Sequence, residues 1–273
     1  MKHWLRALLS RSTGARGVIS DELWQATLNH FPFLAKRSDV DVAQLRALTR
    51  EFLRHKEFHG VDGLRITDAM AVAIASQACL PILNFGTPRQ CLRWYDDFVG
   101  IVVHAGEVLA RRSETDETGI VHNYRERLTG EAMAGGPVTL SWHDVWDSGA
   151  SAAQGYNVVI HEFIHKMDMR DGAADGCPPL PVGFMGAANP RAARQAWLDR
   201  LGGEFARFGE QVVMAERFSG TPTWLDPYGA ESIDEFFAVS CEGYFTNRSV
   251  FADEFPTLVV MYDAFFNAPS PED

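Results

Sequence analysis

The sequence lacks the features of a secreted or membrane-spanning protein. Only four of its 273 residues are cysteines, and they show no short paired spacing of the kind that a disulfide framework needs. No apolar run approaches the roughly 18 residues of a membrane span. Arg6 and Arg11 interrupt the N-terminal segment, which is therefore a poor signal peptide. We expect a cytoplasmic protein with reduced thiols and no membrane span.

Positive charge is also scarce. The chain has 25 Lys and Arg residues against 36 Asp and Glu, a formal net charge of -11. No basic run stands out beyond short clusters such as 111–112, so we expect no direct binding of nucleic acid through broad electrostatic attraction. With 46% hydrophobic and 22% charged residues, the chain is long enough to form a full core and has the composition of a globular protein.

The most informative motif is His-Glu-Phe-Ile-His at 161–165, directly after an apolar run. Residues four apart share one helical face, so the imidazoles of His161 and His165 can both reach one Zn²⁺ at about 2.0–2.1 Å. Glu162 lies round the helix, where it can contact a metal-bound water. Phe163 and Ile164 are expected on the buried side, without a chemical role. The motif predicts metal-assisted hydrolysis.

A catalytic zinc usually takes three protein ligands, so a third must come from elsewhere. No histidine follows His165, which leaves a carboxylate or a residue upstream of the motif. The best carboxylate candidate is Glu235, at the head of an apolar helix. Ser232-x-x-Glu235 is also the spacing of a capping box, and on the residues alone both interpretations stay open. Asp234 could replace Glu235, but it points about 100° away round the helix.

Two further carboxylates could support the histidines. Glu242 lies seven residues after Glu235 on the same helical face and could orient a ligand histidine; a solvated or capping carboxylate is the alternative. Asp168 shares the helical face of His165 and could accept an imidazole N–H or form a helix-end salt bridge. Three other histidines fall in a strand-like region and are expected to be surface or core residues rather than ligands: His104, His122 and His143.

Hydrophobic periodicity predicts helices on both sides of a region of short strands. Helical patterns cover six segments: 19–57, 67–80, 157–169, 191–217, 233–246 and 254–267. β-branched and aromatic residues separated by glycines predict three or four strands between 98 and 146. We expect a charged turn at 113–118, a mobile loop at 130–136 and an irregular Pro/Gly-rich stretch at 172–190. The last two are candidate gates to the site.

A wider set of residues matches a known family. These residues are His161-Glu162-Phe163-x-His165-Lys166-x-Asp168, Tyr228, the run 235–239, and the upstream segments 75–80 and 136–142. Over nearly the whole chain they resemble the Mlc titration factor A family, known as zinc-dependent peptidases of the gluzincin type with a catalytic core related to anthrax lethal factor. The resemblance implies that His161, His165 and Glu235 are the ligands. It also implies that Tyr228 lies near the substrate carbonyl, whereas without it we would interpret Tyr228 as a packed turn aromatic.

Pattern and resemblance together predict a helix-rich α+β fold of the zincin type, with one small mixed sheet beside the motif helix. We expect a single metallopeptidase domain over 1–273, with no linker near residue 90. Within it, 1–90 would form a helical N-terminal wrap, 91–267 the catalytic core and 268–273 a frayed tail. The segment 137–142 could be an edge strand that binds an extended substrate.

The expected function is hydrolysis of a peptide or protein substrate by zinc-activated water. Glu162 would act as general base and then protonate the leaving amine, while Tyr228 stabilises the intermediate. The resemblance implies aminopeptidase character on small substrates and, in some members, a partner role toward a sugar-transport repressor. The alternative is a regulator-binding protein that sequesters such a transcriptional repressor, with zinc structural and hydrolysis incidental. A closed structural zinc site usually has four Cys or His ligands, which argues against that alternative.

Overall fold

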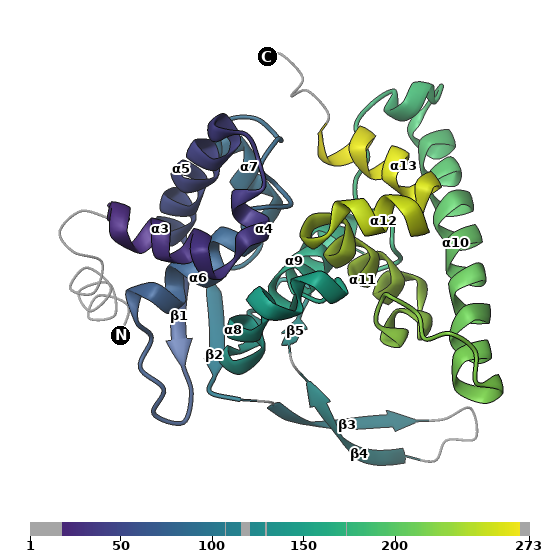
Figure 1. Cartoon of the computed structure of the whole chain (residues 1–273), viewed down its shortest axis with the longest axis horizontal. Helices are drawn as coiled ribbons and strands as arrows, with labels where there is room; N and C mark the ends of the chain where they lie inside the picture. Colours follow the sequence, from purple (N-terminus) through teal and green to yellow (C-terminus); the bar gives the residue numbers. More distant parts are fainter. Residues whose placement is uncertain (1–17, 107, 116–120, 129, 173, 268–273) are drawn as a thin grey trace.

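The computed structural model describes residues 18–267 except 107, 116–120, 129 and 173, with the backbone alone for 108–115, 121–128 and 131. Helices dominate, and one small sheet and a separate two-stranded ribbon accompany them (Figure 1). The helices are α3 (Asp21–His30), α4 (Pro32–Ala35), α5 (Asp39–His55), α6 (Asp68–Ala78), α7 (Pro88–Cys91), α8 (Trp142–Ser151), α9 (Val158–Asp168), α10 (Pro190–Phe218), α11 (Ile233–Thr246), α12 (Arg248–Glu254) and α13 (Pro256–Phe266). The strands are β1 (Glu57–Gly60), β2 (Gly100–His104), β3 (Val108–Thr115), β4 (Val121–Leu128), β5 (Gly130–Ala132) and β6 (Val138–Ser141).

Several helices begin and end where the sequence indicates. Ser20, Thr67 and Asn157 each accept, through the side chain, the backbone amide three residues further on. The motif helix α9 therefore starts directly after Asn157. It ends at Asp168, a short 3₁₀ turn η3 (Met169–Asp171) follows, and Gly172 takes the left-handed conformation with φ of 107°.

The sheet lies beside the motif helix. Its strand order is β1-β2-β6-β5, in which β1, β2 and β6 run parallel and β5 runs antiparallel to β6. Helix α9 packs against β5 and β6. The ribbon of β3 and β4 extends away from the body of the molecule (Figure 1). The helix-rich architecture with one small sheet is thereby confirmed.

Some segments differ from the sequence expectation. Residues 57–60 form β1, and 130–132 form β5 rather than a loop. Both segments are short and become strands only through their partners, which are β2 for β1 and the neighbouring strand β6 for β5. Residues 142–151 form helix α8, with Ser141 as its cap. Strand β6 pairs on both sides, so the segment 137–142 is internal, and the edges of the sheet are β1 and β5. The expected turn at 113–118 is strand up to residue 115, and the rest of it lies outside the described residues.

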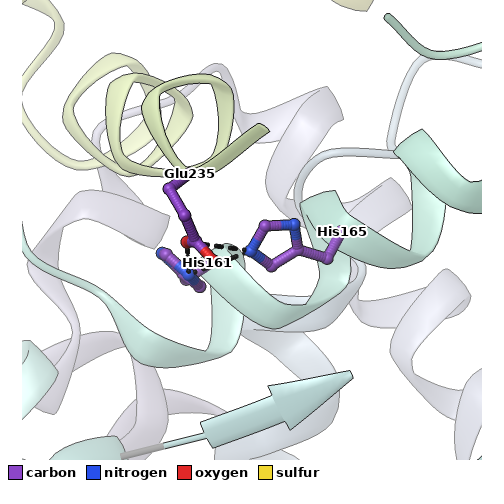
Figure 2. Close-up of side chains that lie close together, drawn as sticks. All are labelled: His161, His165 and Glu235. Carbon is purple, nitrogen blue, oxygen red and sulfur yellow. Dashed lines mark hydrogen bonds and ion pairs between the residues drawn. The ribbon is translucent and has the colours of Figure 1, made fainter. Parts of the chain in front are cut away.

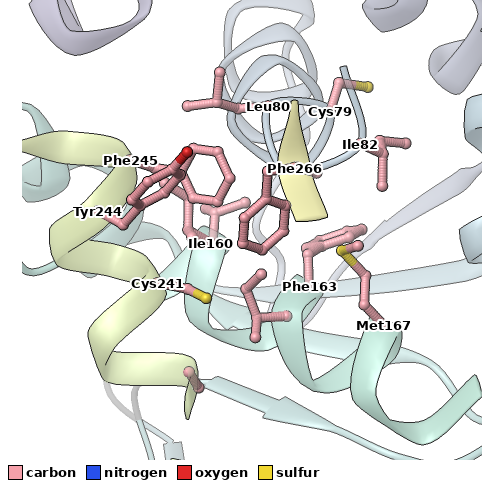
Figure 3. Packing of buried hydrophobic residues seen from close by; sticks show 14 of the residues in the cluster. Cys79, Leu80, Ile82, Ile160, Phe163, Met167, Cys241, Tyr244, Phe245 and Phe266 are labelled. Carbon is pink, nitrogen blue, oxygen red and sulfur yellow. The ribbon is translucent and has the colours of Figure 1, made fainter. Parts of the chain in front are cut away.

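One cluster of buried side chains runs from the first described helix to the last. Figure 3 shows part of it, where side chains of α9, α11 and the end of α13 meet the residues that follow α6. Phe163 and Ile164 are fully buried, as expected. The four cysteines are free and buried. No helix in the described ranges is long and apolar enough to cross a membrane. The single domain over 1–273 and its internal divisions stay predictions.

Candidate metal centre

Two helices bring the metal-ligand candidates together. Helix α9 carries His161 and His165 on one face, and α11 packs against it with Glu235 in its first turn (Figure 2). The Nε2 atom of His161 lies 3.0 Å from Oε2 of Glu235 and 3.1 Å from Nε2 of His165. The Nε2 atom of His165 lies 3.2 Å from the same carboxylate oxygen. Within the described residues, this is the only group of three or more His, Cys, Asp or Glu side chains whose ligand atoms converge.

The three atoms fit a small cation. A tetrahedral ion with bonds of about 2.0–2.1 Å sets its ligand atoms about 3.3 Å apart, close to the separations found here. The Nδ1 atom of His161 lies 2.8 Å from Oε1 of Glu242, so a neutral His161 ring donates its hydrogen there and presents a lone pair on Nε2. That lone pair faces an oxygen of Glu235. Two acceptors at this distance repel each other unless a cation or a proton lies between them.

The pKa shifts of His161 and Glu235 also indicate that a positive charge between these two side chains is favourable. Burial lowers the pKa of His161, but hydrogen bonds with Glu235 and Glu242 outweigh it and hold that pKa well above its usual range. Burial raises the pKa of Glu235, but hydrogen bonds with the two histidines hold it well below its usual range. A proton on His161 and a metal ion would compete for one position, so metal affinity is expected to fall as the pH is lowered.

Glu162 has the environment of a proton-transfer group. Its side chain is 5% exposed. Burial raises the pKa of Glu162 to about 7, against the opposing effect of His161 and His165. A carboxyl group that titrates near neutral pH can both accept a proton and return it. Glu162 does not belong to the converging group of ligand atoms.

Glu242 links the centre to one further helix, α6, through Asn157. It is 1% exposed, so it is not solvated, and burial raises its pKa despite the hydrogen bond with His161. Its Oε2 atom accepts the backbone amide of Asn157, the cap of α9. The side-chain amide of Asn157 donates in turn to Gln77 of α6 at 2.7 Å. A chain of hydrogen bonds therefore runs from α6 to the ring of His161.

Asp168 and Tyr228 lie in different surroundings. One oxygen of Asp168 accepts the backbone amide of Gly176 at 2.8 Å, and the other is buried without a hydrogen-bond partner in the described part of the chain. Burial raises the pKa of Asp168 to about 7. Tyr228 belongs to the 3₁₀ helix η5 (Pro227–Ala230), and its half-buried ring lies 6.1 Å, centroid to centroid, from the ring of His161.

Glu235 faces the histidines, whereas the other ligand candidates with described side chains lie outside the converging group. The amide of Glu235 donates to Ser232 at 3.4 Å, while an oxygen of its carboxylate faces the histidines. Asp234 is outside the converging group. His143 lies exposed on α8, 3.4 Å from Asp147. His104 ends β2 outside the group, and the side chain of His122 lies outside the described residues.

Lys166 is a buried residue of α9 for which the sequence suggested no role. Its Nζ atom donates to Oδ2 of Asp97 at 2.6 Å and to the carbonyls of Met133 and Gly136 at 2.9 and 3.5 Å. It thereby ties the turn between β5 and β6 to the motif helix. A lysine on the buried side of an apolar helix must find such partners, and this is the signal that could have indicated it.

Comparison with known proteins gives one consistent result. The family model of glucose-regulated metallo-peptidase M90 matches residues 4–267. A protein of Cronobacter sakazakii named Mlc titration factor A is 30% identical over 89% of this chain and 84% of its own length. Proteins with the same name from Salmonella arizonae and Klebsiella pneumoniae are also 30% identical, over 90% and 89% of this chain and 91% and 84% of theirs. The resemblance drawn from the motifs is confirmed: the chain belongs to the glucose-regulated metallo-peptidase M90 family.

Proposed function

We propose that this protein is a zinc-dependent peptidase of the zincin type, with His161, His165 and Glu235 as the ligands. One observation carries the proposal: three ligand atoms from two helices converge at separations of 3.0–3.2 Å. Two imidazoles and one carboxylate are a common ligand set of catalytic zinc and leave a coordination position open. Zinc bound there would polarise a peptide carbonyl and make water a stronger nucleophile at neutral pH.

The chain's own residues would move the protons. Glu162, with its pKa raised to about 7, takes a proton from the attacking water and then returns one to the leaving amine. Glu242 accepts the Nδ1 hydrogen of His161 and fixes the orientation of the ring. Tyr228, beside His161, donates to the developing oxyanion of the substrate. We assign Asp168 a supporting role near the end of α9, where it holds the stretch 172–190 through Gly176.

Replacing Glu162 by glutamine tests the proposal. Glutamine keeps the size of the side chain but cannot take a proton, so turnover should fall by about 10²–10⁴-fold. Zinc stoichiometry should stay at that of the wild type, because Glu162 is not a ligand. Both quantities are measured on the same preparations, by metal analysis and by hydrolysis of unblocked peptides. Full turnover in E162Q with unchanged zinc contradicts the proposal.

The finer proposal is an aminopeptidase that acts on small peptides, which the family resemblance supports. The edge strand β5 would pair with the backbone of such a substrate. Turnover should then require a free amino terminus. The measurement compares one peptide series with free and acetylated N-termini, and equal rates for the two forms contradict aminopeptidase character.

A second candidate function is sequestration of a regulator. The names of the relatives say that they titrate Mlc, and this favours a transcriptional repressor of sugar transport as a protein partner of this chain. In that case the metal would be structural. E162Q and the wild type would then bind the repressor equally well in a titration by calorimetry. Equimolar zinc with no turnover on any peptide favours this second function over the first.

A further inference from the structure

We infer that Gly130 is a positioning residue for Glu162, because the missing side chain at this position leaves the space that the Glu162 carboxyl group fills. The inference rests on the proposed role of Glu162 in proton transfer. It gives a function to the first residue of β5, which the sequence alone places in a loop.

The steric relation is direct. A Cβ atom built on Gly130 would lie 2.6 Å from Cγ and 2.7 Å from Cδ of Glu162, and closer still to Oε1. Nonbonded carbon atoms are in ordinary contact at about 3.5–4.0 Å, so any residue other than glycine must displace one of the two partners. Gly130 is not among the glycines with positive φ. Its requirement for glycine is therefore one of space and not of backbone conformation.

The carboxyl group, rather than the strand, is the partner that yields. Gly130 pairs with Leu140 in the sheet, and the turn that follows β5 is held by Lys166 through the carbonyls of Met133 and Gly136. The backbone at 130 is thus held by its pairing with β6 and by the anchored turn that follows β5. The carboxyl group of Glu162 is the end of a flexible side chain, and rotation about its χ angles moves it at low cost.

A small displacement has a large effect on the proposed reaction. Glu162 is 5% exposed, so it cannot relax into solvent without leaving its place beside the histidines. A misplacement of about 1 Å in a reacting group can lower the rate by about 100-fold. The three heavy atoms nearest to the Cβ position of Gly130 all belong to Glu162 and none to the ligands His161, His165 and Glu235, so metal binding should be unaffected.

The test is Gly130→Ala, with Gly100→Ala as the matched control. Gly100 begins β2 of the same sheet, and a Cβ there meets only Cβ of Pro137 at an ordinary 3.5 Å. We expect kcat of G130A to fall by about 10–100-fold, with KM within about twofold of the wild type, zinc stoichiometry unchanged and G100A close to the wild type. A kcat of G130A within twofold of the wild type overturns the inference. Failure of G130A to fold while G100A folds also overturns it, since the strand would then have yielded.

A shorter side chain at 162 distinguishes positioning from general damage. Aspartate withdraws the carboxyl group from the Cβ of residue 130, so Glu162→Asp should lower kcat by a smaller factor in the G130A background than in the wild type. If the factors by which E162D and G130A each lower kcat simply multiply in the double variant, the inference is overturned. A crystal structure of G130A gives a readout besides activity: the carboxyl group of Glu162 should be displaced there and unmoved in G100A. The crystal structure does not depend on turnover, so it tests the inference about Gly130 separately from the proposed function. Failure of the proposed function would instead be seen with E162Q.

Discussion

Replacing Glu242 by glutamine tests how tightly the ring of His161 is oriented. Both oxygens of Glu242 accept hydrogen bonds, one from Nδ1 of His161 at 2.8 Å and the other from the backbone amide of Asn157. Glutamine has one oxygen and one NH₂ group, so it can accept only one of these bonds. At the other position two donors would face each other. E242Q must therefore lose the partner of His161 or the partner of the amide at the start of α9.

The size of the effect follows from the burial of this contact. Glu242 is 1% exposed, so solvent does not reach this position to replace the lost acceptor. Loss of a carboxylate that orients a metal-binding histidine typically lowers metal affinity by about 10–100-fold, or about 1.4–2.7 kcal/mol. We expect this loss for zinc, measured at neutral pH by competition with a chromophoric chelator. Circular dichroism should show that E242Q retains its helices.

Glu204→Gln is the matched control for this measurement. Glu204 is a partly buried carboxylate of α10 that pairs with Arg207 at 2.7 Å and accepts the hydroxyl of Thr257; within the described residues, its hydrogen bonds and ion pairs involve no ligand candidate. Its replacement removes the same charge, so a zinc affinity lowered equally in E204Q would mean a general charge effect. Zinc affinity of E242Q within twofold of the wild type would refute the expectation that both carboxylate oxygens of Glu242 are needed to orient His161.

Two further replacements test the surroundings of the motif helix. Asp168→Asn should stabilise the metal-free protein at pH 8 but not at pH 4. Burial raises the pKa of Asp168 to about 7 in the native protein, above the unfolded value of 3.8, so protonated Asp168 stabilises the fold below pH 3.8. This stabilisation, up to about 4 kcal/mol, is lost as the pH rises through 7. Urea unfolding at the two pH values measures it, and equal shifts would disprove it. Lys166→Met should cost about 3 kcal/mol of unfolding free energy, the low end for a broken buried pair because Asp97 is 25% exposed. Urea unfolding again measures it, and a loss below about 1 kcal/mol would show that the turn at Met133 does not depend on this bond.

The parts of the fold that the sequence predicts well are those encoded within a few neighbouring residues. Asn157 caps the motif helix through the amide of Ile160, a bond that spans three positions. Gly172 ends that region because only a residue without a side chain adopts its φ of 107° at little cost. The face that α9 buries follows from the apolar spacing of Phe163 and Met167. Each of these features can be recognised without knowledge of the rest of the chain.

The parts that the sequence does not predict depend on contacts that form only when the chain is folded. The three residues of β5 include a glycine and an alanine and have low intrinsic strand preference, and only their hydrogen bonds with β6 make them a strand. The space at Gly130 becomes meaningful only once β5 lies against Glu162. The same limit applies to Glu235, since its distance from Ser232 suits a capping box as well as a ligand. The contact with His161 favours the proposed role as a ligand, and it joins residues 74 positions apart.

Helix α11 supplies both the carboxylate at Nε2 of His161 and the carboxylate at Nδ1 of the same ring, from Glu235 and Glu242. These carboxylates come from residues seven positions apart, which corresponds to about two helical turns and a rise of about 10.5 Å. The imidazole ring therefore lies between two long side chains of α11. A shift of α11 along α9 by one turn, about 5.4 Å, would break both contacts together. The position of Glu235, the proposed third ligand, and the orientation of His161 therefore both depend on the α9–α11 interface. Substitutions in the buried contacts of that interface should alter zinc affinity before they alter the helices themselves, because helical hydrogen bonds are local and the alignment of the two helices is not.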